Sequence, residues 1–139
     1  NWSPAKIFMG DSGSYFLGAI YFNILLSTRS TEELISFLIL GTPIFADISI
    51  TLIKRFFIGE NIFKPHKLNL YQRLNQAGLS HSKISLIYLL NSFLLCFCYL
   101  FGGITLLFIA EIIVLLFGYL LDKYIAIDFK SSLLESKNK

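Results

Sequence analysis

Four long apolar stretches alternate with polar segments along this chain, a pattern typical of membrane-spanning helices. The stretches cover residues 15–28, 34–57, 84–101 and 104–121. The first is short, because a helix needs about 20 residues to cross a bilayer core. The second is interrupted by Gly41 and Pro43, and the last two are joined by Gly102-Gly103. Such a tight link predicts an antiparallel helical hairpin.

The polar segments complete the organisation. They are a start over residues 1–14, one long loop over 58–83 and a tail over 122–139. Hydrophobic residues make up 55% of the 139 and charged residues only 15%, whereas a soluble domain carries about 25% charged residues. We therefore expect an all-α integral membrane protein with about four transmembrane helices.

The Lys and Arg residues are divided unequally between the two sides that four spans would create. The start, the long loop and the tail share one side and hold all of the 12 cations except Arg29. By the positive-inside rule this side is cytoplasmic. The net charge of +3 thus reports topology, and we expect no nucleic-acid partner.

Asp11 is the first candidate for chemistry, because it lies where the first apolar helix begins. Glycine and serine surround it, in the order Gly10-Asp11-Ser12-Gly13-Ser14. An oxygen ligand at a helix N-terminus suits a hard cation and the phosphates that the cation carries. The same residues also make an ordinary turn and helix cap, so both interpretations stay open.

The long loop is the second candidate. Its sequence predicts a short helix over residues 68–77 with one apolar stripe, ended by Gly78. We expect the loop's donor side chains to gather on the polar side of that helix, where they suit a phosphate-rich substrate. The alternative is an interfacial loop whose cations touch lipid headgroups. The donors are His66, Lys67, Asn69 and Arg73.

Two acids lie within the apolar stretches, where an unpaired carboxylate is costly. Asp47, in the second stretch, is either a structural partner inside the bundle or a contributor to a polar site. Glu111 lies near the centre of the fourth. Folding about Gly102-Gly103 brings it near Asn91, so we expect a buried Glu111–Asn91 hydrogen bond, with a proton or ion pathway as the alternative.

Both polar motifs resemble one family, the polyprenyl-phosphate N-acetylhexosamine-1-phosphate transferases of glycosyltransferase family 4. The branch that initiates O-antigen and related surface polysaccharides resembles the loop most closely. Two loop positions depart from it: Lys67 replaces an arginine and Asn69 replaces a histidine. The matching residues are Asn1, Pro4, Ala5, Phe8, Met9, Gly10 and Asp11 at the start, and His66, Leu70, Tyr71, Gln72, Arg73 and Leu74 in the loop.

The resemblance implies a reaction and its participants. An undecaprenyl phosphate oxygen attacks the pyrophosphate of a UDP-N-acetylhexosamine, and UMP leaves. Asp11 would be the catalytic residue and a ligand of Mg²⁺ (or Mn²⁺). The residues implied to bind substrate or phosphate are Asn1, His66, Lys67, Asn69 and Arg73. The location implied is the bacterial cytoplasmic (inner) membrane, multi-pass and surrounded by lipid, with the active face toward the cytoplasm.

The chain does not begin with Met, and family members carry further helices with an adjacent Asp pair. We therefore expect it to be the C-terminal part of one transmembrane transferase domain, inactive alone, whose partners include the missing N-terminal helices. The sequence leaves open whether the protein is a homodimer. The motifs do not specify which sugar is transferred. Two alternatives are a non-enzymatic membrane subunit, such as a transporter half or scaffold, and a degenerate transferase, since Asn69 cannot take up a proton.

Overall fold

The computed structural model describes residues 10–137, and this part of the chain is helical without a strand. The all-α fold class is therefore confirmed for the described residues. Residues 1–9, which include Asn1, lie outside them. The helices are α1 (Gly10–Leu26), α2 (Thr31–Leu40), α3 (Thr42–Ile58), α4 (Leu70–Gln76), α5 (His81–Tyr124) and α6 (Phe129–Lys137).

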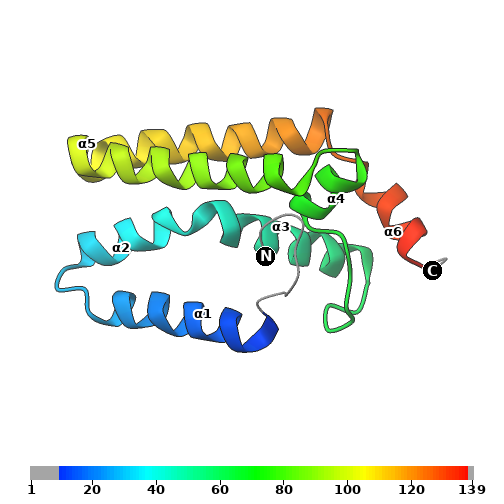
Figure 1. Cartoon of the computed structure of the whole chain (residues 1–139), viewed down its shortest axis with the longest axis horizontal. Coiled ribbons are helices and arrows are strands. Elements are labelled where there is room, and N and C mark those ends of the chain that lie inside the picture. The colour runs from blue at the N-terminus through cyan, green and yellow to red at the C-terminus, as the bar shows by residue number, and fades with distance from the viewer. Residues whose placement is uncertain (1–9, 138–139) are drawn as a thin grey trace.

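α5 is a hairpin of two helical limbs. It contains 44 residues, and its backbone leaves the helical conformation at Gly103, where φ is 62° and ψ is −159°. Figure 1 shows the two limbs running back along each other. A positive φ is readily adopted only by glycine. The hairpin predicted from Gly102-Gly103 is confirmed.

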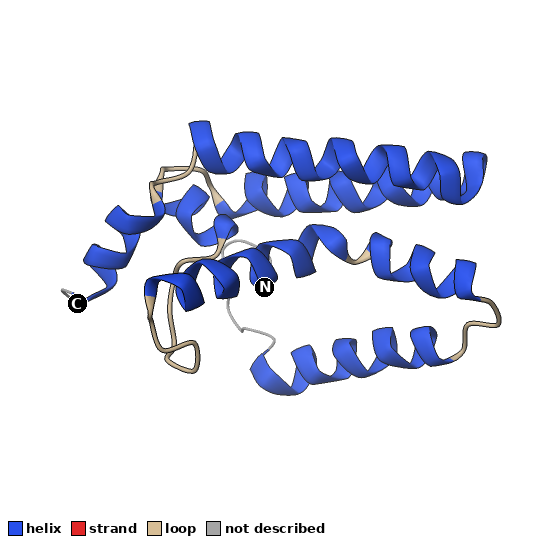
Figure 2. Cartoon of the chain, turned by 180° about the vertical axis from the view of Figure 1, so that it is seen from behind, coloured by secondary structure: helices blue, strands red, loops and turns tan. Residues whose placement is uncertain are grey.

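α2 and α3 form a broken helix. Their axes differ by 71° across the break, which Figure 2 shows as a short loop between two helical pieces. A larger residue than Gly41 at this break would displace its neighbours, because an added Cβ would come within 2.5 Å of the Phe45 ring and 2.6 Å of the Tyr21 hydroxyl oxygen. That hydroxyl donates to the Phe37 carbonyl oxygen at 2.7 Å and so ties α1 to α2. The predicted interruption at Gly41 and Pro43 is confirmed.

α1 is the least buried of the long helices. None of its described side chains is buried, and its large apolar side chains include Tyr15, which is 75% exposed. A helix that is apolar all round suits a lipid or protein environment rather than water. The packing of α1 in this structure is against α2.

The helix lengths bear on the number of spans. α5 is the one described helix that is by itself long and apolar enough to cross a membrane, and the bent α2–α3 pair qualifies only as one combined span. Each limb of α5 holds roughly the 20 residues that a crossing needs. α1 has 17 residues. The structure is that of a helical protein with membrane character, and the count of four spans stays a prediction.

Positive charge is divided unequally between the two ends of this bundle. The α1–α2 connection, which holds Arg29, lies at the same end as the turn of α5 (Figure 1). α4 and both termini of α5 lie at the opposite end. Most described cations belong to segments at that second end: Lys54, Arg55, Lys64, Lys67, Arg73, Lys83, Lys123 and Lys130.

Two apolar clusters hold the helices together. The first joins the α5 limbs through Leu95 and Ala110, with Ile39 and Leu40 of α2 against them. The second joins α4 to both ends of α5 and contains Leu74, Ile84 and Leu121. The second cluster brings the long loop against the hairpin.

The expected hydrogen bond between Glu111 and Asn91 is wrong. Glu111 is buried, at 9% exposure, but its polar neighbour is the Thr42 hydroxyl beside the α2–α3 break. Its Oε2 has no hydrogen-bond partner among the described residues. The broken helix brings Thr42 into reach, which the pairing of two straight limbs did not anticipate.

Candidate functional site

The helix predicted in the long loop is confirmed as α4, and it is docked inside the protein. Leu68, just before it, is 1% exposed, and Leu74 within it is fully buried. α4 packs against both α3 and α5. The interfacial-loop alternative therefore does not describe α4, although it stays open for the exposed residues that precede it.

Asp47 anchors the start of α4. Its Oδ1 accepts the Leu70 backbone N–H at 2.6 Å, and its Oδ2 accepts that of Tyr71 at 3.3 Å. Oδ2 also accepts the Tyr88 hydroxyl at 2.8 Å. A carboxylate at a helix N-terminus pairs the unsatisfied N–H groups and interacts favourably with the helix dipole. The sequence left two roles open for Asp47, and these contacts are those of a structural partner inside the bundle.

Asn69 occupies the N-cap position of α4. Its backbone N–H donates to Gln72 Oε1 at 3.2 Å, which is the returning half of a capping box. Asparagine is among the residues most favoured at an N-cap. The Asn69 side chain itself makes no capping hydrogen bond, and its buried Oδ1 has no partner among the described residues.

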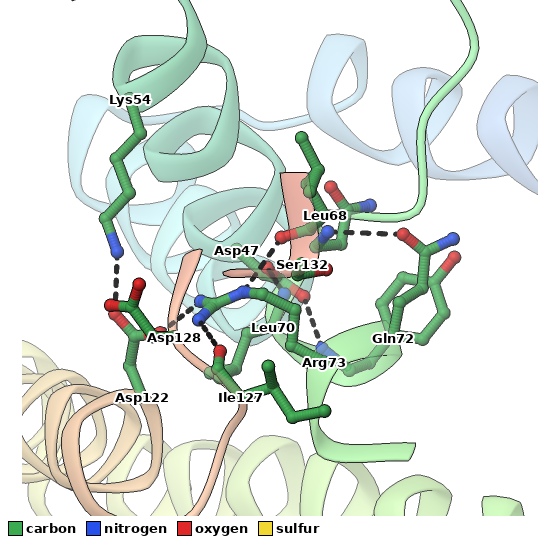
Figure 3. Close-up of polar contacts among 12 residues, drawn as sticks. Asp47, Lys54, Leu68, Leu70, Gln72, Arg73, Asp122, Ile127, Asp128 and Ser132 are labelled. Atoms are coloured by element: carbon green, nitrogen blue, oxygen red, sulfur yellow. Dashed lines mark hydrogen bonds and ion pairs between the residues drawn. The ribbon is translucent and has the colours of Figure 1, made fainter. Parts of the chain in front are cut away.

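Arg73 is the most fully engaged of the predicted substrate-binding residues. It is 3% exposed. Its Nε donates to the Leu68 carbonyl oxygen at 3.0 Å and its Nη1 to that of Ile127 at 2.9 Å. Its Nη2 is paired with Asp122. Figure 3 shows the guanidinium among these partners, which come from the loop, the α5–α6 connection and α5.

The expectation that the four donors gather on one polar side is wrong for Arg73. Its guanidinium points into the protein toward the ends of α5 and α6, whereas Lys67 is exposed and His66 half-buried. The physical reason is charge pairing: the sequence pattern treats a cation on a short helix as solvated, but the carboxylate of Asp122 draws this one inward.

One hydrogen bond favours a single tautomer of His66. Its Nδ1 accepts the Leu68 N–H at 3.3 Å, so in the neutral ring Nε2 carries the proton. Partial burial, and then the charge of Arg55, hold the pKa of His66 below its usual value of 6.5. A neutral ring with a fixed Nε2–H is a hydrogen-bond donor suited to a phosphate oxygen.

Arg55 holds the segment between α3 and α4 in place, a role that sequence reasoning missed. It is 3% exposed. Its guanidinium donates to the carbonyl oxygens of Ile62 and Lys64, each at 3.3 Å, and to that of Asn61. Gly59 supplies the sharp exit from α3 with φ 77°. The one available signal was the position of Arg55 in the turn before the helix-ending glycine. A cation near a helix C-terminus is favourable.

Asp122 and Lys54 were also missed as a pair. Lys54 Nζ lies 2.6 Å from Asp122 Oδ2, and Arg73 takes the other carboxylate oxygen. Burial would raise the pKa of Asp122, but the hydrogen bonds from Lys54 and Arg73 and their charges outweigh it and lower the pKa. The acid at the end of the last apolar stretch was visible in the sequence, but its partners lie far away along the chain.

Asp11 stands apart from these contacts. It is exposed in the first turn of α1, and within the described residues its carboxylate has no hydrogen-bond or ion-pair partner. The same part of the chain contains no group of three His, Cys, Asp or Glu side chains that could hold a metal ion. Since Mg²⁺ is commonly held by one or two carboxylates together with substrate phosphates and water, Asp11 could supply one ligand.

Two cavities border the pair formed by Asp47 and Tyr88. Their volumes are about 390 Å³ and 440 Å³, and apolar side chains of α3 and α5 make up most of their walls. The carboxylate that borders both is already bonded to α4 and α5. The cations that line the smaller cavity, Lys54 and Arg73, are both paired with Asp122, so neither is free to bind an anion.

Comparison with known proteins bears on the two motifs. The model of glycosyl transferase family 4 matches residues 1–29. A Bacillus subtilis (strain 168) protein, named as a probable undecaprenyl-phosphate N-acetylglucosaminyl 1-phosphate transferase, is 41% identical over 97 residues, which are 66% of this chain and 27% of that protein. No solved structure matches.

Mycobacterial relatives match a similar share of the chain. The decaprenyl-phosphate N-acetylglucosaminephosphotransferases of Mycobacterium leprae (strain TN) and Mycobacterium tuberculosis (strain ATCC 25618 / H37Rv) are each 32% identical over 63% of it, covering 26% and 25% of their own lengths. The resemblance is confirmed: the chain is a homologue of the polyprenyl-phosphate N-acetylglucosamine-1-phosphate transferases of glycosyl transferase family 4. It spans about a quarter of the length of the curated relatives it matches.

Proposed function

We propose that this chain takes part in transferring N-acetylhexosamine 1-phosphate from a UDP-sugar to undecaprenyl phosphate, as a step that initiates a cell-envelope polysaccharide of the O-antigen type or a related one. The observation that carries the proposal is the family match over residues 1–29, which contain Asp11. The names of the relatives support a polyprenyl phosphate acceptor and an N-acetylglucosamine donor.

In the proposed reaction, an oxygen of the lipid phosphate attacks the phosphorus that carries the sugar. The new P–O bond forms as the bond to the bridging oxygen breaks, and UMP leaves with the electron pair. Negative charge builds on the leaving phosphate, so catalysis depends on positioned positive groups. Mg²⁺, when bound, would offset this charge.

The residues of this chain have distinct proposed tasks. Asp11 supplies one metal ligand, because its carboxylate is exposed and has no described partner. His66 donates its Nε2–H to a phosphate oxygen, and the exposed Lys67 adds a positive charge nearby. Asn1 and Asn69 are further proposed contacts of the substrate. The location proposed is a bacterial inner membrane with this site on the cytoplasmic face, which the grouping of cations at the α4 end supports.

The proposal is tested by UMP release from UDP-N-acetylhexosamines in the full-length protein, with undecaprenyl phosphate and Mg²⁺. The matched control is Asp128→Asn, which makes the same change in an exposed acid at the start of α6. We expect lipid-dependent UMP release that falls at least about 100-fold in Asp11→Asn and persists in Asp128→Asn. A folded protein that releases no UMP from any donor would contradict the proposal and favour the degenerate or non-enzymatic alternative.

A further inference from the structure

Asp122 lies where four elements of the chain meet. It belongs to the last turn of α5, and its two carboxylate oxygens each pair with a different cation. Lys54 comes from α3 and Arg73 from α4. Figure 3 shows the carboxylate between these two side chains. One acid therefore links three helices that are distant in the sequence.

The fourth element is α6, through the ring of Phe129. Lys54 Nζ and the Arg73 guanidinium carbon each lie 5.6 Å from the centre of this ring. Phe129 is 8% exposed. Cations at this distance from an aromatic ring are attracted to its electron-rich face, more strongly where water is excluded. The start of α6 thus covers the same two cations that Asp122 neutralises.

A continuous path of contacts leads from Asp122 to His66. Asp122 pairs with Arg73, whose Nε donates to the Leu68 carbonyl oxygen at 3.0 Å. The N–H of the same Leu68 donates to His66 Nδ1 at 3.3 Å. Both polar backbone groups of Leu68 are therefore bonded: its carbonyl oxygen to Arg73 and its N–H to the imidazole of His66.

We propose that Asp122 is a positioning residue for His66, acting through Arg73 and the Leu68 backbone to hold the loop histidine as the Nε2–H tautomer. This inference rests on the proposed function only for the statement that His66 serves transfer. The placement of the loop by Asp122 stands on the contacts alone.

The carboxylate charge is what the position requires. Arg73 is 3% exposed, and a buried guanidinium without a counter-charge is strongly disfavoured. An amide at position 122 could still accept a hydrogen bond but would not neutralise Arg73. The arginine would then turn toward solvent and release Leu68. Lys54 has a side chain that is 36% exposed, so water replaces its partner more readily.

Amide hydrogen exchange of the full-length protein in lipid nanodiscs tests the placement without any substrate. The variant is Asp122→Asn, and the matched control is Asp128→Asn. We expect exchange across residues 70–77 to become about tenfold faster or more in Asp122→Asn, with α1 and α2 unchanged. The control should match the wild type over residues 70–77. Unchanged exchange in Asp122→Asn would overturn the inference.

Imidazole nitrogen spectra give a readout that a merely structural role would not move. The signal of His66 is assigned with His66→Gln. We expect a single Nε2–H tautomer for His66 in the wild type and in Asp128→Asn, and a mixture of tautomers in Asp122→Asn. A retained single tautomer in Asp122→Asn would overturn the positioning role even if the exchange became faster.

A double variant separates the path through Arg73 from an independent effect. Arg73→Gln/Asp122→Asn should speed exchange no more than Arg73→Gln alone, because the two residues act through one contact; additive effects would overturn the path. If Asp122→Asn does not fold, Asp122→Glu keeps the charge, and exchange within about threefold of the wild type is expected. If the wild type releases no UMP, the proposed function fails while these measurements still decide the placement.

Discussion

The start of α1 and the docked helix α4 both carry charged residues that match the same family, yet these residues differ in exposure and in pairing. Asp11 is exposed and without a described partner. Arg73 of α4 is buried, as is Asp47 of α3, which anchors α4, and nearly every polar atom of these two side chains is bonded to protein. A match to a motif therefore does not distinguish a residue that meets a substrate from one that holds the fold.

The difference follows from the cost of burying charge. A carboxylate or guanidinium removed from water must be paired and hydrogen-bonded to remain charged. Asp47 and Arg73 meet this requirement inside the protein, which commits their atoms to positioning α4. Asp11 is exposed among the described residues, so its charge is not committed to another group there.

The largest expected effect on stability comes from Asp47→Ala. This change removes acceptors from two backbone N–H groups of α4 and from Tyr88, and we expect it to lower the free energy of unfolding by about 3 kcal/mol. The measurement is thermal unfolding of the full-length protein in detergent. The control, Asp11→Ala, should leave stability unchanged. Equal melting temperatures for the two variants would break the comparison.

A smaller effect is expected from Asn69→His, which restores the residue usual in the family. Because the Asn69 side chain makes no capping hydrogen bond that the change could remove, stability should change by less than about 1 kcal/mol. We expect no gain in UMP release, because Asn69 is proposed to contact the substrate as a hydrogen-bonding group and not to transfer a proton. A substantial gain in release would show instead that the chain lacks a proton-transfer group, and would favour the degenerate transferase.

The smallest effect is a pH dependence from His66. Because burial and Arg55 hold the pKa of His66 below 6.5, the unfolded chain binds the proton more readily than the native protein. The stability contribution is complete above pH 6.5 and is lost as the pH falls through the lowered native pKa. His66→Gln should flatten this part of the stability curve. A His66 pKa above 6.5, measured by NMR titration, would contradict the structure.

Much of the fold was predictable from the sequence because its signals are local. Gly102-Gly103 predicted the hairpin of α5, Gly41 and Pro43 predicted the break between α2 and α3, and Gly78 predicted the end of α4. Each depends on backbone conformation at one or two residues. The Glu111 pairing failed because it depends on how α2 and α3 pack against α5, which no local signal reports.

The site was predictable to the extent that it resides in motifs. The loop helix was predictable because its residues lie in one continuous segment. The inward turn of Arg73 could not be predicted, because its partner Asp122 lies 49 residues further along the chain. The role of Arg55 could not be predicted for another reason. It binds backbone carbonyl oxygens, which every residue has, so the residue types of its partners give no signal.

The central claim is that Asp11 at the start of α1 acts on substrate, whereas the buried Asp47 and Arg73 act on the fold. The most direct test measures UMP release and melting temperature together for Asp11→Asn and Arg73→Gln in the full-length protein. The account predicts that Asp11→Asn abolishes release at an unchanged melting temperature, and that Arg73→Gln lowers the melting temperature. If Arg73→Gln abolished release with an unchanged melting temperature, Arg73 would act in the transfer reaction rather than on stability, and the claim would be wrong.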